Sequence, residues 1–371
     1  MSKERFKAQG EDSFFGRFVY DSVIPPNHFL VKLKEIIPWQ RFTDKLVKYY
    51  SGQARRGRAP YDPALLLRML LVSFLYDLSE RQTEEVVNYH LPIKWFVGLA
   101  VNEKAPDHST LTAFKARLIE NGSIGAFEGM LREIITIAQE SGVEFGSIQV
   151  MDSVHTVADV NTDKDDRRQK KGGQGPRDPH ARWGVKHSRR ARTRQGRVIE
   201  QKEYFHGYKA HVSLNTGSEL ITSMTFTPGN GYDGHQLPRL LEKDLEQGVP
   251  IEIVSGDRGY DDSDNHVLLA SKGIHSAIRL NGYRTGKKDP SKQVWLDLQS
   301  SPEYKLGLKE RYKVERKFGE AKVGHGLRRC RYIGLVRYAI QGFLTAIALN
   351  LKRMVKLLMG VNFRGRATAR A

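Results

Sequence analysis

The chain has 371 residues, of which 39% are hydrophobic and 27% charged, so it is long enough to bury a sizeable core and to form two or three domains. Its 60 lysines and arginines exceed its 42 aspartates and glutamates, which gives a formal net charge of +18. This excess indicates a polyanionic partner, with nucleic acid ahead of an anionic membrane. The single cysteine, Cys330, excludes an intramolecular disulfide.

The two longest apolar stretches are "ALLLRMLLVSFLYDL" and "AIQGFLTAIALNL". Both are short or interrupted, the first by Arg68 and Asp77 and the second by Gln341, whereas a membrane span needs about 20 apolar residues. We therefore expect two buried helices. Because the N-terminus also has no apolar signal region, the sequence predicts a cytoplasmic protein.

Residues 60–118 have helical patterns. Asp62 and Pro63 form an N-cap and first-turn pair, and Ser79 with Gln82 forms a capping box before a second helix. A third helix is predicted near "DHSTLTAFKARL". Three short helices with tight turns fit a helix-turn-helix DNA reader, and they equally fit a plain helical packing domain.

From about residue 147 the pattern changes to strands that alternate with helices. Strands are predicted at 147–157, 204–215, 220–228, 251–257 and 274–280, and helices at 234–246, 264–273, 311–332 and 336–358. This alternation predicts an α/β domain with a mixed sheet and flanking helices.

A basic insertion at about 162–202 interrupts the strand pattern. It is rich in glycine and arginine and nearly free of aliphatic residues, so it cannot bury enough apolar area to order itself, and a flexible loop is expected. Contact with DNA is favoured over an idle loop, because arginine side chains pair well with phosphates. The residues concerned are Arg189, Arg190, Arg192, Arg194 and Arg197, with Trp183 nearby.

Two aspartates follow or lie within predicted strands. Asp152 is inside the apolar stretch "VMDSV", and Asp257 follows "IEIV" in the turn "SGDRGYDD". Carboxylates at strand ends are suitable Mg²⁺ ligands for phosphodiester chemistry. Each aspartate alone also fits a plainer interpretation, a hydrogen-bonded buried carboxylate or an ordinary turn.

A third acidic group comes from the segment "RYKVERKFGEAK". On a helix that advances about 100° per residue, Arg311, Glu315 and Lys322 lie at roughly 0°, 40° and 20°, which is one stripe. Glu320 lies near 180°, where the sequence predicts a surface ion pair with Arg316 at i,i+4. The two glutamates are therefore expected to differ in role.

The order of "VMDSV", "YFHGYKAHVSL", "IVSGDRGYDD" and "RYKVERKFGEAK" resembles that of the bacterial insertion-sequence transposases of the DDE class. The resemblance implies that Asp152, Asp257 and Glu315 are the catalytic carboxylates and hold two Mg²⁺ ions, for which Mn²⁺ can substitute. It also implies that Arg311 and Lys322 handle DNA phosphates. The tyrosine of that helix signature is replaced by Leu308 in this chain.

The same resemblance implies a fold and a domain organisation. A helical N-terminal domain at 1–145 is expected to bind element ends. An RNase H-like catalytic domain at 146–360 is expected to carry the basic insertion, and a basic tail occupies 361–371.

The resemblance further implies that the protein acts on double-stranded DNA, namely element ends with inverted repeats and a target, as a homodimer associated with the bacterial nucleoid. Lys209 and His211 of "HGYKAH" are expected near the substrate. A nuclease that cuts without joining, and an inactive DNA-binding protein, remain the alternatives.

Overall fold

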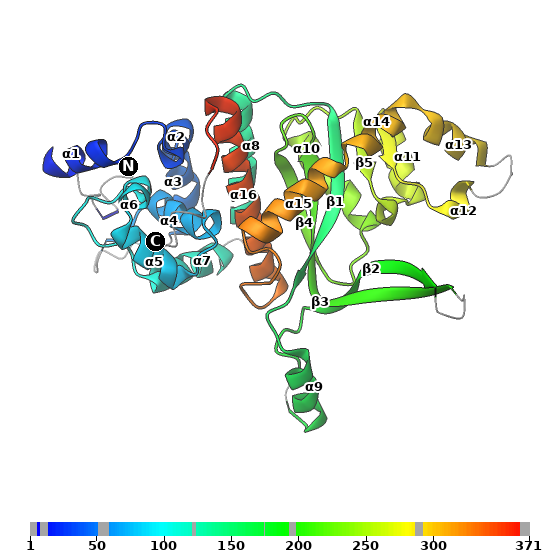
Figure 1. The fold of residues 1–371 in the computed structure, drawn as a ribbon, viewed down its shortest axis with the longest axis horizontal. Coiled ribbons are helices and arrows are strands. Elements are labelled where there is room, and N and C mark those ends of the chain that lie inside the picture. The colour runs from blue at the N-terminus through cyan, green and yellow to red at the C-terminus, as the bar shows by residue number, and fades with distance from the viewer. Residues whose placement is uncertain are drawn as a thin grey trace. The chain divides into compact units, whose positions relative to one another are not determined.

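The computed structural model describes residues 6–7, 14–50, 59–120, 124–173, 175–192, 198–285 and 292–363, without the side chains of 187–201. The chain forms two compact units. One comprises Met1–Val143 together with Leu344–Ala371, and the other comprises Glu144–Phe343. Figure 1 shows that the first is helical and the second is built around a sheet.

In its described residues, the helical unit contains eight α-helices that precede the sheet in the chain, and the later part of a long helix, α16 (Leu335–Met359). The eight are α1 (Phe14–Val23), α2 (Phe29–Ile36), α3 (Gln40–Leu46), α4 (Pro63–Leu75), α5 (Glu80–Tyr89), α6 (Leu91–Val97), α7 (His108–Glu120) and α8 (Gly125–Glu140).

Helix starts in this unit follow the local signals in the sequence. The side chain of Asp62 accepts a hydrogen bond from the Ala64 amide, and Pro63 occupies the first turn of α4, all of whose residues are buried. Ser79 and Gln82 form both hydrogen bonds of the capping box of α5. These two predicted helices and the third, α7, are confirmed.

The second unit has a six-stranded mixed sheet. Its strands are β1 (Ile148–Val157), β2 (Arg182–Arg192), β3 (Val198–Asn215), β4 (Ile221–Pro228), β5 (Ile253–Gly256) and β6 (His275–Ile278). The order is β2-β3-β1-β5-β6, with β4 also paired to β3. β1 is antiparallel to β3 and parallel to β5, and β6 is parallel to β5. The predicted mixed sheet with flanking helices is thus confirmed.

Helices cover the parallel part of the sheet on both faces. They are α10 (Leu237–Glu246), α11 (Ser263–Ser271), α12 (Gly282–Thr285), α13 (Gln293–Ser300), α14 (Pro302–Glu310) and α15 (Tyr312–Gly324). Met151 and Val254 pack with Leu240 of α10. On the other face Ile253 packs with Tyr304 of α14, as expected where parallel strands are buried twice.

The basic insertion is ordered where it is described, so the expectation of a flexible loop was wrong. It forms α9 (Thr162–Lys170) and then β2, which pairs with the start of β3 as a two-stranded arm projecting from the sheet (Figure 1). A hairpin satisfies its backbone between its own strands and needs little apolar burial. In α9, the side chain of Asn161 caps the first turn. The first turn carries acidic residues and the last turn basic ones, and both complement the helix dipole.

None of the helices among the described residues is both long and apolar enough to cross a membrane.

Candidate active site

Asp152 lies on the central strand of the sheet. β1 places it opposite Val212 of β3, and only 9% of the residue is exposed. Its Oδ1 accepts a hydrogen bond from the Ser153 amide at 2.7 Å, and its Oδ2 accepts one from Nη2 of Arg311 at 3.1 Å. A carboxylate at this depth needs such partners, because an unpaired buried charge is costly.

Asp257 lies beside Asp152 because of the strand register. Met151 of β1 pairs with Gly256 of β5 in a parallel ladder, so the next residues of the two strands are neighbours on one face of the sheet. Asp257 follows the last residue of β5 and accepts the Gly259 amide on Oδ1 at 2.8 Å. The tight turn thus holds the carboxylate at the carboxyl end of the strand, where α/β sites form.

Both carboxyl groups are harder to ionise than usual. Burial raises the pKa of Asp152 to about 7, with a further increase from the charge of Asp257 and a decrease from Arg311. Burial also raises the pKa of Asp257; the Gly259 amide opposes this, and Asp233 adds to it. A bound cation would favour the ionised forms of both.

Asp233 is an acidic group at this site that the sequence analysis missed. Its carboxylate contacts Nζ of Lys209 at 2.8 Å and accepts the Ser153 hydroxyl at 3.2 Å. A Cβ atom at Gly259 would lie 3.0 Å from Oδ1 of Asp257 and 3.1 Å from Oδ2 of Asp233, so both carboxylates flank that glycine. The only local signal was its place in the turn "GNGYDGHQ", which has no apolar pattern.

The two β3 residues expected near the substrate differ in exposure. Lys209 is partly exposed, and its Nζ also donates to the Gly231 carbonyl at 3.0 Å. His211 is fully buried, and its Nε2 contacts the Thr227 hydroxyl at 2.9 Å. Burial lowers the pKa of His211 to about 4, so its ring is neutral at pH 7 and lies beneath Lys209 and Asp233.

Arg311 connects this site to α15. It is the junction residue between the two helices: α14 ends just before Arg311 and α15 begins just after it, and its backbone is helical. Glu315 follows four residues later, in the first turn of α15, and is exposed. α15 is continuous through Gly319. Arg311 therefore reaches Asp152, whereas the structure shows Glu315 at the surface of the same helix.

The second glutamate lies elsewhere on α15. Glu320 contacts Nζ of Lys317 at 3.4 Å. Arg316, for which the sequence predicted a pair with Glu320, contacts Glu219. Leu308, at the tyrosine position of the helix signature, packs in the apolar cluster of α14 with β5 and β6.

Basic residues gather near the end of α15. The pKa of Lys322 is lowered by burial and then by the charges of Lys186 on β2 and Arg328. Arg189, Arg190 and Arg192 lie on β2; Arg194, also predicted to contact DNA, lies outside the described residues, as does Arg197. Like charges held close together favour an anionic ligand, because its charge offsets their repulsion.

The carboxylates supply oxygen ligands, which suit Mg²⁺ and Mn²⁺. Among the described residues, one group of three has ligand atoms within 4.8 Å of one another, and it is Glu84, Asp107 and His108. There Glu84 accepts the amide of His108 and Asp107 accepts that of Ser109, which is how α7 begins. Asp152, Asp257 and Glu315 are thus not gathered this closely.

Comparisons with known proteins give two family matches. Residues 18–117 match a family described as a transposase domain, and residues 164–351 match one described as a transposase DDE domain. Asp257 and Glu315 lie inside the second match, and Asp152 lies twelve residues before it, from 152 to 164.

Among solved structures, the Mos1 transposase paired-end complex with left transposon end is 10% identical, with 74% of this chain and 82% of that chain covered and a TM-score of 0.20. A pre-cleavage Mos1 transpososome is also 10% identical, with 81% and 98% covered and a TM-score of 0.20. Similarity at this level is too weak to establish a shared fold.

Proposed function

Since this chain belongs to the family of transposases with a DDE domain, we propose that its α/β unit cuts DNA at the ends of a mobile element and joins the freed 3′ ends to target DNA. The observation that carries this proposal is the pair of carboxylates Asp152 and Asp257, which the parallel pairing of β1 with β5 brings side by side. Arg311, from the helix that bears Glu315, reaches into the same site.

Asp152, Asp257 and Glu315 would hold two Mg²⁺ ions, with Mn²⁺ as a substitute. When bound, these ions supply activation of the attacking oxygen and stabilisation of the leaving oxygen. In the first reaction water attacks the phosphorus, the bond from phosphorus to the 3′ oxygen breaks, and that oxygen takes up a proton. In the second reaction the freed 3′-hydroxyl attacks a target phosphodiester in the same way.

The cationic side chains would orient the DNA. Arg311 donates to Asp152 from one side, and its charge can also face a phosphate oxygen. Lys209 is held by Asp233 and the Gly231 carbonyl, which points its charge at the same face. Lys322 would bind the phosphates farther along the strand, together with the arginines of β2.

We further propose that the helical unit, whose residues 18–117 match a transposase domain, binds the element ends and that two copies act together on the DNA. The helices of this unit enclose an apolar interior. The proposal is made for the unit as a whole.

The test is a cleavage assay with the full chain. The probe is linear double-stranded DNA that carries the sequences flanking its coding region, labelled at the 3′ and 5′ ends. We expect nicking with Mg²⁺ or Mn²⁺ and none in EDTA, followed by joined products when a supercoiled plasmid is added.

Cleavage that continues in EDTA would overturn the metal mechanism. Cleavage without joined products would identify a nuclease, and binding without cleavage at any metal concentration would identify an inactive DNA-binding protein.

A further inference from the structure

A short turn directly follows Asp257, one of the two aspartates proposed to bind metal. It consists of a single helical turn, η4 (Arg258–Tyr260), on which the Gly259 amide donates to Asp257. Arg258 is exposed, whereas Tyr260 is fully buried under the turn. So short a segment has few internal hydrogen bonds, and its position depends on what holds it from behind.

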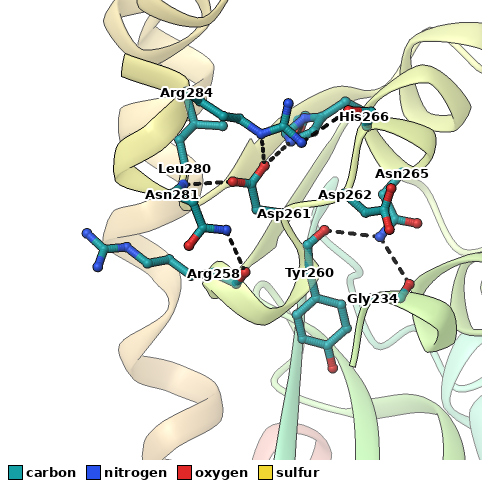
Figure 2. A network of polar contacts seen from close by, with 12 residues as sticks. Gly234, Arg258, Tyr260, Asp261, Asp262, Asn265, His266, Leu280, Asn281 and Arg284 are labelled. Atoms are coloured by element: carbon teal, nitrogen blue, oxygen red, sulfur yellow. Dashed lines mark hydrogen bonds and ion pairs between the residues drawn. The ribbon is translucent and has the colours of Figure 1, made fainter. Parts of the chain in front are cut away.

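Behind the turn lies a polar network centred on Asp261 (Figure 2). The side chain of Asp261 has no exposed surface. It forms an ion pair with Nε of Arg284 at 2.6 Å, accepts the Asn281 amide at 2.7 Å and contacts Nε2 of His266 at 3.0 Å. The end of the turn, α11 and residues 281–284 thus meet at one carboxylate.

The orientation of the histidine in this network is fixed at both nitrogens. Ser276 on β6 contacts Nδ1 of His266 at 2.9 Å. Since Asp261 can only accept when it is ionised, Nε2 of His266 donates to it and Nδ1 accepts the Ser276 hydroxyl. The edge of Trp295 lies against the ring, with centroids 4.8 Å apart. The carboxylate of Asp261 therefore has a rigid set of donors.

Two asparagines connect this network to the turn by hydrogen bonds (Figure 2). Nδ2 of Asn281 donates to the Arg258 carbonyl at 3.2 Å. Nδ2 of Asn265 donates to the Tyr260 carbonyl and to the Gly234 carbonyl, both at 3.0 Å. The carbonyls on both sides of Gly259 are thus held. Asn265 also ties the turn to the residue after Asp233.

We propose that this network, with Asp261 at its centre, is a positioning device that sets the place of the Asp257 carboxylate relative to Asp152 and Asp233. The inference rests on the proposed function, because the geometry matters only if Asp257 binds metal. A buried ion pair such as Asp261 with Arg284 adds little net stability compared with apolar packing. Its main effect is on the position of the Asp257 carboxylate, in the way that residues hydrogen-bonded to metal ligands orient those ligands.

The experiment compares two variants with a matched control in the full chain. Asp261→Asn removes the central charge. Asn281→Ala removes only the side-chain contact with the Arg258 carbonyl, at a partly exposed site where folding is not at risk. Asp264→Asn is the control: it removes a carboxylate charge three residues after Asp261, from an exposed residue outside the network.

Three quantities are measured: the melting temperature, amide hydrogen exchange of residues 257–262, and Mn²⁺ binding by titration calorimetry. We expect Asn281→Ala to keep the wild-type melting temperature, to exchange faster at Gly259 and Tyr260, and to bind Mn²⁺ about 10-fold more weakly. Asp261→Asn is expected to weaken binding by up to about 100-fold, the upper range for outer-shell changes. The control should match the wild type in all three.

Wild-type exchange and wild-type Mn²⁺ binding in folded Asn281→Ala would overturn the inference, whatever Asp261→Asn does. If the wild-type protein itself binds no Mn²⁺, the proposed function fails at its metal step. Hydrogen exchange then tests the network alone, and unchanged exchange in Asn281→Ala would reject its role.

Discussion

Burial raises the pKa values of Asp152 and Asp257; the charge of Asp257 adds to the effect on Asp152, and the charge of Asp233 adds to the effect on Asp257. Arg311 offsets only part of it. Carboxyl groups in this state bind protons and cations competitively, since either one relieves the cost of a buried negative charge. The chemistry of this site should therefore depend on pH in a range where most carboxylates do not titrate.

For Mn²⁺ binding we expect the apparent affinity to fall as the pH decreases through about 7, the pKa of Asp152, because the proton must leave before the metal binds. Titration calorimetry at pH 6 and pH 8 measures this. Asp152→Asn should bind weakly at both values and lose most of the dependence on pH. Equal wild-type affinity at the two pH values would contradict the raised pKa.

The same shift affects stability in the absence of metal. The folded protein keeps the proton on Asp152 to a higher pH than the unfolded chain does, because the pKa of this carboxyl is near 3.8 when the chain is unfolded. The stabilising effect of that proton is complete below about pH 4 and is lost as the pH rises towards 7. Between these values the melting temperature should therefore fall less in Asp152→Asn than in the wild type, as measured by calorimetry in EDTA.

Glu315 and Glu320 offer a second test at this scale. Glu315→Gln keeps the size of the side chain and removes a charge, so we expect cleavage to drop by at least about 10²-fold, as for the loss of one preorganised electrostatic group. DNA binding should persist or tighten. Rates from single-turnover cleavage and binding by fluorescence anisotropy separate the two effects.

The matched control is Glu320→Gln, which removes the same charge five residues later on α15. It loses a partly buried i,i+3 contact with Lys317, away from the carboxylates of β1 and β5, and should cleave at nearly the wild-type rate. If Glu320→Gln abolished cleavage and Glu315→Gln did not, the third carboxylate would be misassigned.

Among the elements, the arm of β2 and β3 lies, with α9, where the sequence analysis expected a flexible loop. Its backbone hydrogen bonds pair Val185 with Tyr204 and continue to the end of β2. Trp183 and Tyr204 are 58% exposed, each of them a large ring in solvent. An exposed aromatic and basic arm is suited to nucleic acid, because bases stack on rings and phosphates pair with cations.

A shortened arm tests this role. Residues 186–203 are replaced by Asn-Gly, which can close the Val185–Tyr204 pair as a type I′ turn. The change removes seven Lys and Arg residues and two Glu residues, a net loss of five positive charges. We expect weaker DNA binding with an unchanged circular dichroism melting curve. A variant that fails to fold would show that the arm stabilises the sheet, and unchanged binding would remove it from the DNA interface.

For the whole molecule, the net charge of +18 predicts that phosphate contacts dominate DNA affinity. If about 6–10 phosphates are neutralised, the logarithm of the binding constant should fall against the logarithm of salt concentration with a slope of roughly −5 to −9. The shortened arm should give a shallower slope. The slope is measured by fluorescence anisotropy from about 50 to about 300 mM KCl. A wild-type slope near zero would refute this prediction.

The sequence by itself determined the elements whose signals are local. The caps at Asp62 and Ser79 start α4 and α5, and the strand patterns around Asp152 and Asp257 predict β1 and β5, because capping and side-chain alternation involve neighbours in the chain. The stripe of Arg311 and Glu315 was a prediction from helical geometry; in the structure Arg311 lies at the junction before α15 and contacts Asp152, whereas Glu315 is exposed. The family resemblance then supplied the roles expected of these residues.

Only the tertiary structure decided which side chains meet. Asp152 contacts Arg311 across 159 residues, and Arg316 contacts Glu219 across 97 residues. Asp233 joins the site through Lys209 on another strand, and the arm is ordered by pairing between strands. Such contacts depend on strand register and helix packing, whose free energies come from many residues together, so no local pattern around any one of these side chains predicts its partner.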